Sequence, residues 1–510
     1  MVAPSKHAAA KPLTSKVRIY KPEEIDLVSL ATKSQSELGK IPHEFQKRFF
    51  SNVMQGKDVI LDIGTGSGKS LCFDLPVLLD KMDIALIVSP LTALMLEQAA
   101  ASPLESLAIC QETMSEQGKD ALYKRAAEGT CQRIFVSPEV AGSLDFGRKI
   151  LAQPRFREHL RLVVIDEAHC VSLWGGSFRS EYAELGVLRG RVPSATVFAI
   201  ASATLPVHVL DDVWAKLKIG KDAATVSMSN ARPNVALSVR KIIHPDETKA
   251  DLRFLLPNGA TTAAEVPVSL VYFNQRIETE DACDRLQSWA ADLGIEKSAI
   301  AFYHAKIGTA RKRELERLLK EGKVRILCCT NAVGMGCDMR NIQRVILWKF
   351  PPSFCAVAQR SGRAVRDFLA LGEVISFVPA KVLKDGIAEE QARAAREEAA
   401  EPHNQEGDDL PEAQDGQEVV AGQAVAIGEG GVRVEQNAEA DGEEDAEVIK
   451  AVQKKRKRKA ARVSQADALE AKFLSRFACT TACRRIVWDD YFQNDKKRKQ
   501  LQSFFLLSGS

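Results

Sequence analysis

The stretch "DVILDIGTGSGKS", from Asp58 to Ser70, joins an apolar run to a turn with three glycines, followed by a lysine and a serine. This order is typical of a strand, a phosphate-binding loop and a helix, in which backbone N–H groups surround the phosphates of a nucleotide. Lys69 is expected to reach the β- and γ-phosphates, and the hydroxyl of Ser70 to bind Mg²⁺. Ile63 occupies the position of the first glycine in the usual pattern. The residues predicted to surround the nucleotide are Thr65, Gly66, Ser67, Gly68, Lys69 and Ser70.

Two carboxylates follow a second apolar run in the stretch "RLVVIDEAH", which ends at His169. The apolar run ends at Ile165, and Asp166 and Glu167 come directly after it. Ligands of α/β proteins bind at the carboxyl ends of the strands, where Asp166 and Glu167 are expected to lie. Asp166 is predicted to hold Mg²⁺, directly or through water, and Glu167 to orient and deprotonate the attacking water. Together with the phosphate-binding loop, this pair predicts a nucleoside triphosphatase.

Short β-branched runs alternate with helical patterns from about residue 40 to residue 380. Strands buried on both faces of a parallel sheet read as continuous hydrophobic runs. These runs are too many for one sheet of ordinary size, and the stretch "NARPNVALSVRK", which begins at Asn230, is interpreted as the joint between two sheets. The sequence therefore predicts an α/β fold with two domains and a tail. The predicted strands are DVILDI, IALIVS, RIFVS, RLVVIDE, TVFAIAS, VSLVYF, VRILCCT, RVILWKF and EVISFV.

The composition is that of a globular intracellular protein. The chain has 510 residues, of which 45% are hydrophobic and 27% charged, and this length is typical of about three domains. No apolar run approaches the ~20 residues of a membrane span, and the first residues lack the apolar stretch of a secretory signal, so no membrane partner is expected. Eleven cysteines, mostly inside apolar runs, favour buried thiols in a reducing compartment over a disulfide framework.

The net charge of +3 averages two segments of opposite sign. Residues 386–450 are acidic and free of aromatic side chains, which predicts a disordered linker, although its first part also fits an extended helix. The basic run "KKRKRK", Lys454 to Lys459, follows closely. Such a run is typical of a nuclear localisation signal or a nucleic-acid contact, with a solvated helix start as the alternative. We therefore expect a nuclear protein.

Several motifs together resemble the motor core of superfamily 2 helicases, namely IGTGSGKS, DEAH, SAT (Ser202 to Thr204), TNAVGMGCD (Thr330 to Asp338) and QRSGRAVRD (Gln359 to Asp367). Within that superfamily the chain resembles the RecQ-type DNA helicases, through VSPLTALMLEQ, DEAHCVSLWGGSFRSEY, ARPNV and YHA. This resemblance implies two tandem RecA-like domains, use of ATP and Mg²⁺, and binding of single-stranded and duplex DNA. It also implies 3′-to-5′ movement on the bound strand and unwinding of the duplex. The match is to a eukaryotic member that is shortened at its C-terminus.

The resemblance implies roles for single residues. Gln46 matches the glutamine that reads adenine, while His43 stands where an arginine is usual. Ser202 and Thr204 match the motif that relays the nucleotide state to the second domain. The side chains implied to reach across the cleft are Gln359, Arg363 and Arg366, and the two arginines would neutralise charge on the γ-phosphate. The residues implied to link nucleotide and nucleic acid are Thr330 and Asp338.

An aromatic loop follows the two carboxylates. In the family this loop contacts single-stranded DNA and couples that contact to the nucleotide site, a role that carries over to Trp174, Phe178 and Arg179. A flat aromatic ring stacks on any base, at about 1–3 kcal/mol per base. The alternative is that Trp174 and Phe178 pack in the core. The family usually carries His and Asp at the positions of Gly176 and Ser177, so weaker coupling is expected.

The tail "FACTTACRRIVWDDYF", which begins at Phe477, resembles the start of the zinc-binding subdomain of the family. Cys479 and Cys483 are followed by no further cysteine, so two thiols do not complete a four-ligand site, and no zinc site is expected. The tail is instead predicted to dock on the second domain. The side chains expected to dock are Phe473, Phe477, Trp488, Tyr491 and Phe492.

The predicted divisions are an N-terminal extension over 1–37, an ATP-binding RecA-like domain over 38–225, a C-terminal RecA-like domain over 226–385, the linker over 386–450 and a basic segment with a helical tail over 451–510. Two alternatives to a DNA helicase remain open. DEAH also occurs in RNA-directed ATPases, and a short tail is compatible with a DNA-binding remnant that unwinds weakly. The sequence identifies no protein partner.

Overall fold

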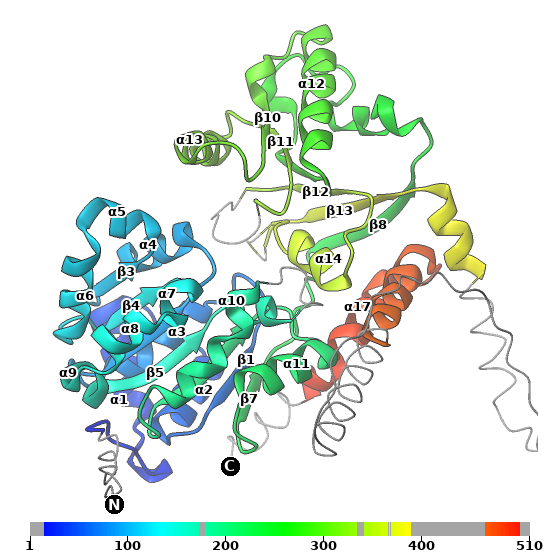
Figure 1. Cartoon of the computed structure of the whole chain (residues 1–510). Coiled ribbons are helices and arrows are strands. Elements are labelled where there is room, and N and C mark those ends of the chain that lie inside the picture. The colour runs from blue at the N-terminus through cyan, green and yellow to red at the C-terminus, as the bar shows by residue number, and fades with distance from the viewer. Residues whose placement is uncertain are drawn as a thin grey trace, which may run out of the picture. The chain divides into compact units, whose positions relative to one another are not determined.

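The computed structural model describes residues 15–172, 179–333, 341–365, 367, 369–388 and 465–499. Two parallel β-sheets, each with its own helices, form one compact unit with the C-terminal helices (Figure 1). The prediction of two α/β domains with parallel sheets is confirmed. No helix in this described part of the chain is long and apolar enough to cross a membrane.

The first sheet has seven strands in the order β3-β4-β2-β5-β6-β1-β7, and all its pairs are parallel. Apolar side chains on its two faces pack into two separate clusters, one beneath each layer of helices. The strands are β1 Val59–Asp62, β2 Ile84–Val88, β3 Ser106–Ile109, β4 Arg133–Val136, β5 Leu160–Ile165, β6 Val197–Ser202 and β7 Ala224–Ser227. The helices are α1 Leu27–Leu38, α2 Glu44–Met54, α3 Lys69–Asp74, α4 Thr92–Ala100, α5 Gln111–Gln117, α6 Lys119–Ala127, α7 Pro138–Gly142, α8 Leu144–Phe146, α9 Pro154–His159, α10 Ser180–Ala183 and α11 Val207–Leu217.

The second sheet has six parallel strands in the order β10-β11-β9-β12-β13-β8. Its strands are β8 Val235–Lys241, β9 Ser269–Tyr272, β10 Ile300–Tyr303, β11 Ile326–Cys329, β12 Arg344–Trp348 and β13 Gly372–Val378. Its helices are α12 Arg276–Asp292, α13 Thr309–Lys320 and α14 Phe354–Ser361, with a further helix over residues 380–388.

The predicted joint between the sheets is wrong in its second half. β8 pairs with β13 over its whole length, from Val235 beside Gly372 to Lys241 beside Val378. The two sheets are therefore connected by residues 228–234, which include only the first part of the predicted joint, residues 230–234. The exact domain boundaries stay predictions.

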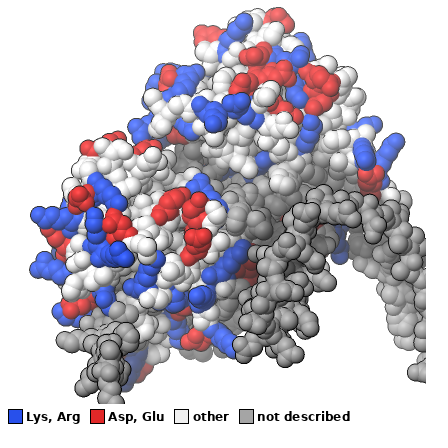
Figure 2. Space-filling model, viewed as in Figure 1, with Lys and Arg blue, Asp and Glu red and all other residues white. Residues whose placement is uncertain are grey.

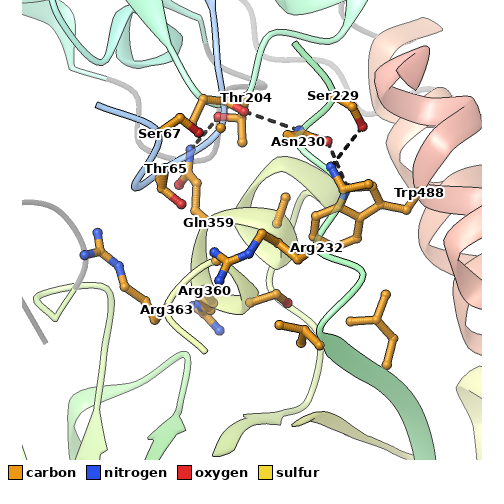
Figure 3. A pocket seen from close by; sticks show the side chains of 18 of the residues that line it. Thr65, Ser67, Thr204, Ser229, Asn230, Arg232, Gln359, Arg360, Arg363 and Trp488 are labelled. Carbon is orange, nitrogen blue, oxygen red and sulfur yellow. Dashed lines mark hydrogen bonds between the residues drawn. The ribbon is translucent and has the colours of Figure 1, made fainter. Parts of the chain in front are cut away.

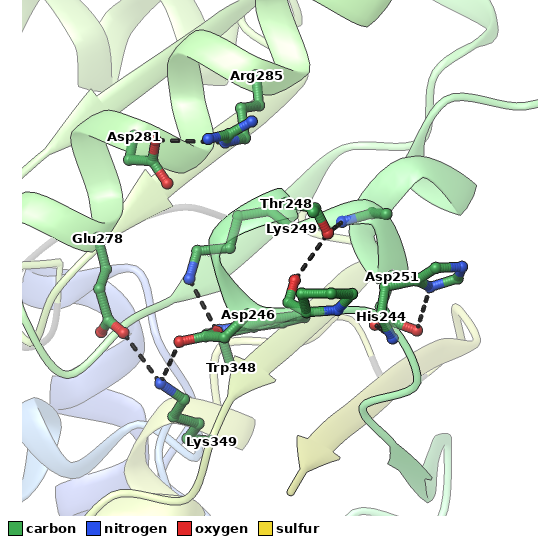
Figure 4. A network of polar contacts seen from close by, with 12 residues as sticks. His244, Asp246, Thr248, Lys249, Asp251, Glu278, Asp281, Arg285, Trp348 and Lys349 are labelled. Atoms are coloured by element: carbon green, nitrogen blue, oxygen red, sulfur yellow. Dashed lines mark hydrogen bonds and ion pairs between the residues drawn. The ribbon is translucent and has the colours of Figure 1, made fainter.

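A polar network closes one end of the second domain (Figure 4). The carboxylate of Asp246 accepts hydrogen bonds from the indole of Trp348 at 2.8 Å, from Lys249 at 2.9 Å and from Lys349 at 2.7 Å. Lys349 also contacts Glu278 at 3.2 Å. Burial alone would raise the pKa of Asp246, but the three hydrogen bonds outweigh it and lower the pKa to about 2.

The C-terminal tail forms a helix over residues 465–479 and then α17, Arg484–Phe492. Phe354, the first residue of α14, is fully buried at the centre of the aromatic side chains that the tail supplies. The tail rings within 6.4 Å of its ring are those of Phe473, Phe477, Trp488, Tyr491 and Phe492. The predicted docking on the second domain is confirmed.

The docking is nevertheless wider than predicted, because the tail also holds the first domain. Glu470 in the tail accepts a hydrogen bond at 2.8 Å from His208 of α11 and one at 2.6 Å from the backbone of Phe354. One buried carboxylate thus contacts both domains. Cys479 is half-buried and donates to the carbonyl of Leu383, and the absence of zinc stays a prediction.

Two predictions fall outside the part of the chain that the structure describes. These are the acidic linker, apart from its first three residues, and the basic run from Lys454 to Lys459.

Candidate active site

The phosphate-binding loop joins β1 to α3 as the sequence predicts. Gly66 and Gly68 adopt φ values of 81° and 85°, a region that glycine enters without steric cost, and α3 begins directly at Lys69. The ammonium group of Lys69 donates to the carbonyl oxygens of Ile63 at 2.9 Å and of Gly64 at 3.2 Å. The lysine therefore lies over the loop, with its charge beside the site where phosphates are predicted to bind.

The two predicted carboxylates lie at the carboxyl end of β5, in the same sheet. Asp166 is buried, and one of its oxygens accepts the backbone N–H of Glu167 at 3.0 Å. Burial, followed by the neighbouring charge of Glu167, raises the pKa of Asp166, while Lys69 lowers it. Glu167 adopts a φ of 50°, which costs energy for a residue with a side chain. Such local strain is common where a side chain has to be aimed at a reacting group.

A chain of polar contacts leads from Glu167 to the second domain. Nδ1 of the buried His169 lies 3.3 Å from the carboxylate of Glu167 and 2.8 Å from the hydroxyl of Ser202. That hydroxyl accepts the backbone N–H of Thr204 at 3.2 Å, and the hydroxyl of Thr204 accepts a bond from the side chain of Gln359 at 3.2 Å. Burial lowers the pKa of His169, which favours the neutral form of its imidazole. The carboxylate that is predicted to act as the base is thus connected to a residue of α14 through polar contacts.

A cavity of about 190 Å³ lies between the two domains, beside this polar chain (Figure 3). Gly362 closes one side, since a Cβ atom there would lie 3.1 Å from the hydroxyl of Thr65. Arg363 is buried in its wall. The other lining residues that matter below are Ser67, Glu167, Thr204, Asn230, Arg232, Gln359 and Trp488. The cavity therefore brings the phosphate-binding loop, the predicted catalytic base and a buried arginine of the other domain to one space.

Two family models match the chain. A model described as DEAD/DEAH box helicase matches residues 43–213, and one described as helicase conserved C-terminal domain matches residues 260–367. The first match contains the loop and the carboxylates, and the second contains Gln359 and Arg363.

Curated relatives match this chain over about two thirds of its length. The chain is 31% identical to the rat (Rattus norvegicus) ATP-dependent DNA helicase Q5 over 61% of its own length, and 29% identical to ATP-dependent DNA helicase RecQ of Pasteurella multocida over 66%. A probable ATP-dependent DNA helicase RecS of Bacillus subtilis is 30% identical over 63% of the chain. The chain belongs to the RecQ-type helicases of superfamily 2. Its aligned part spans 32%, 50% and 61% of these relatives, respectively.

Solved structures agree on the fold of this RecQ-type chain. The helicase MrfA in a complex with DNA aligns with a TM-score of 0.56 at 19% identity, covering 76% of this chain and 56% of that one. The DEAD-box helicase Mss116 in a complex with single-stranded RNA aligns with a TM-score of 0.55 at 16% identity, covering 74% and 79%. At these identities the likeness shows that the two domains are RecA-like.

Gln46 lies between the start of α2 and the phosphate-binding loop. It is buried, its oxygen accepts the backbone N–H of His43 at 2.7 Å, and its nitrogen donates to the carbonyl of Gly68 at 2.8 Å. In this RecQ-type chain it therefore caps α2 and fixes the phosphate-binding loop. Its contact with adenine stays a prediction.

The other predicted residues divide into placed and undescribed ones. Ser70 is exposed at the second position of α3, Thr330 follows β11, and Arg179 donates to the carbonyl of Pro90 at 2.8 Å. The predicted site residues that lie outside the described residues are Trp174, Phe178, Asp338 and Arg366.

Two residues that lie in the site were not predicted from the sequence to belong to it. His169 is part of the quoted DEAH motif, and Arg232 is part of the quoted ARPNV motif. Arg232 donates to the carbonyl oxygens of Ala364 and Val365, in the segment that carries Arg363. Val365 has a φ of 32°, which is an outlier for a β-branched residue. The arginine of the joint therefore holds a strained turn beside Arg363.

Proposed function

We propose that the chain is an ATP-dependent DNA helicase that moves 3′-to-5′ on single-stranded DNA and unwinds duplex DNA. The observation that carries the proposal is the cavity between the domains, which is lined by Ser67, Glu167 and Arg363. A phosphoryl-transfer enzyme works chiefly by positioning and charge stabilisation, and these residues supply a loop, a base and a cation for that purpose.

In this proposal each residue of the loop region has one task. Backbone N–H groups from Thr65 to Ser70 hold the phosphates of ATP, and Lys69 moves from its carbonyl partners to the β- and γ-phosphates. Ser70 and Asp166 carry the oxygen donors that Mg²⁺ prefers, and the charge of Lys69 lowers the pKa of Asp166. Bound Mg²⁺ would neutralise phosphate charge. Glu167 orients and deprotonates the attacking water.

The second domain completes the site when it approaches the first. Arg363 and Arg366 neutralise the charge that develops on the γ-phosphate, an effect worth on the order of 10³–10⁵ in rate in other enzymes. Gln359 donates a hydrogen bond to Thr204, so a movement of α14 alters the polar contacts that lead to Glu167. Closure with ATP and opening after hydrolysis would then alternate the grip of the two domains on a strand.

The proposed partner is DNA, because the curated relatives quoted above are named as DNA helicases. Trp174, Phe178 and Arg179 are proposed to contact single-stranded DNA, and Thr330 and Asp338 to link that contact to the nucleotide. Basic and acidic side chains are interspersed over both domains on the face in view in Figure 2. The proposal therefore includes stacking of aromatic rings on the bases in addition to contacts between basic side chains and the DNA backbone. Nuclear location is part of the proposal and is supported by the basic run.

The test is ATP hydrolysis by the Lys69→Ala variant. Hydrolysis should fall to background, because the charge contact to the phosphates is lost, while binding to single-stranded DNA should stay within about twofold of the parent protein. Lys57→Ala is the matched control, since Lys57 is exposed in the same domain. Turnover that persists in Lys69→Ala would reject the assignment.

A second measurement separates the nucleic-acid classes. Hydrolysis is measured with single-stranded DNA and with RNA of the same length, and strand displacement is measured on duplexes with a 3′ or a 5′ overhang. Stimulation by DNA and displacement from the 3′ overhang support the proposal. Stimulation by RNA alone would replace it with an RNA-directed ATPase.

A further inference from the structure

A residue of the C-terminal tail lies beside the strand that leads into the phosphate-binding loop. After α17 the chain continues as a helix over residues 494–499, whose Lys497 places its ammonium nitrogen 2.6 Å from a carboxylate oxygen of Asp62. Both side chains are about nine-tenths buried. The neighbouring Asn494 is fully buried and bonds the backbone and the side chain of Asn230 in the joint. The ion pair is therefore part of a packed contact.

Asp62 is the last residue of β1 and directly precedes the loop. The carbonyl oxygens of the next two residues, Ile63 and Gly64, are those that accept hydrogen bonds from Lys69. The carboxylate of Asp62 and the ammonium group of Lys69 thus lie on one short stretch of chain. The charge of Lys69 is among those that lower the pKa of Asp62, so a change in the charge of Asp62 also affects the lysine that is proposed to bind ATP.

The charges around Asp62 are few. Burial raises its pKa, while Lys497 and then Lys69 lower it. From α14 of the second domain, the thiol of Cys355 lies near enough to be affected by the same carboxylate. Lys497 is the cation in direct contact, and the other oxygen of Asp62 has no hydrogen-bond partner among the described residues. Without Lys497, the nearest compensating charge for a buried carboxylate would be Lys69.

We propose that Lys497 is a positioning residue for ATP binding, which neutralises Asp62 and so leaves Lys69 available to the triphosphate. A buried carboxylate without a partner attracts the nearest cation strongly, because the surrounding dielectric is low. In the absence of Lys497, Asp62 competes with the phosphates for Lys69. The C-terminal tail is then part of the nucleotide site, through the contact of Lys497 with the residue that precedes the loop. This inference rests on the proposed function, in which Lys69 contacts ATP.

The experiment measures the dissociation constant of a non-hydrolysable ATP analogue, together with KM and kcat for ATP, in the full-length chain. Lys497→Met should weaken analogue binding and raise KM on the order of tenfold, the change that one pKa unit of electrostatic energy produces, with a smaller effect on kcat. Lys497→Arg keeps the charge and should stay within about twofold of the parent protein. Lys496→Met is the matched control, since Lys496 is the exposed neighbour on the same helix.

The decisive variant is the double substitution of Asp62→Asn with Lys497→Met. It removes both charges, so Lys69 has no competitor, and analogue binding should return to within about twofold of the parent value. Binding that stays as weak as in Lys497→Met would overturn the inference and leave Lys497 with a packing role. If Lys497→Met does not fold, Lys497→Gln replaces it in the same comparison. A parent protein that binds the analogue without hydrolysing it would reject the proposed function while the binding comparison still decides this inference.

Discussion

Removal of the Glu470 carboxylate tests whether the tail holds the two domains together. Glu470 is buried and accepts from three donors, namely the imidazole of His208, the backbone N–H of Phe354 and the hydroxyl of Tyr491. Burial raises the pKa of Tyr491, so its hydroxyl stays protonated and donates. The donors come from the first domain, the second domain and the tail, and Glu470→Ala leaves all three without this acceptor.

The expected magnitude follows from the cost of buried groups without partners. Each buried donor that loses its acceptor costs about 1–3 kcal/mol, but the hydroxyl of Tyr491 keeps the thiol of Cys355 as a partner at 3.4 Å, so the full cost of three such groups is not reached. Water that enters the space left by the side chain satisfies some of them, and neighbouring groups are not additive. We therefore expect a loss of about 3 kcal/mol in the free energy of unfolding. Glu470→Gln keeps one acceptor oxygen and should lose less.

Urea unfolding followed by circular dichroism gives the change in stability, and limited proteolysis reports release of the tail. Asp495→Ala is the control, because Asp495 is an exposed acid of the same tail. A loss below about 1 kcal/mol, with unchanged protease resistance of the tail, would refute the reasoning. It would mean that the aromatic contacts with Phe354 hold the tail without the polar bridge.

Three further outcomes are expected. Since the pKa of Asp246 lies near 2 in the fold and near 3.9 in an unfolded chain, its stabilising effect is complete above about pH 4 and is lost as the pH falls toward 2. Asp246→Asn should flatten the fall of Tm in that interval, and an unchanged pH dependence would argue against the network. Trp174→Ala should keep basal hydrolysis but lose most stimulation by single-stranded DNA, and full stimulation would make Trp174 a packing residue. A zinc-selective chelator, added with Mg²⁺ in excess, should leave folding and hydrolysis unchanged. Metal analysis that finds one zinc per chain, together with unfolding on chelation, would contradict this.

The strands that were predicted from the sequence and those that were missed differ in their position in the sheets. The nine predicted runs correspond to β1, β2, β4, β5, β6, β9, β11, β12 and β13, which lie inside the two sheets. The four missed strands, β3, β7, β8 and β10, are the edges. An interior strand is covered on both faces and reads as a continuous apolar run. An edge strand such as β8 is partly exposed, so its "VALSVRK" resembles a connection.

The site shows the same division between local and distant signals. Lys69, Asp166 and Glu167 follow strands directly, so their place at the sheet edge follows from the chain itself. The bond between Gln359 and Thr204 and the grip of Arg232 on the turn at Val365 depend on how two domains meet. The periodicity of the sequence carries no information on how the two domains contact each other.

In the C-terminal tail, the residue types predicted the docking but not the polar contacts. Its aromatic side chains predicted docking, because a chain segment rich in large rings buries them, and that much was confirmed. Its polar residues gave no such signal, since a lysine such as Lys497 in a basic stretch reads as solvated. Lys497 acquires a role only through Asp62, a strand residue near the other end of the chain, whose buried charge has to be balanced. The same aromatic contacts that anchor the tail to the second domain therefore bring a cation to the first. The proposed dependence of the nucleotide site on this cation involves a segment that no motif in the loop predicts.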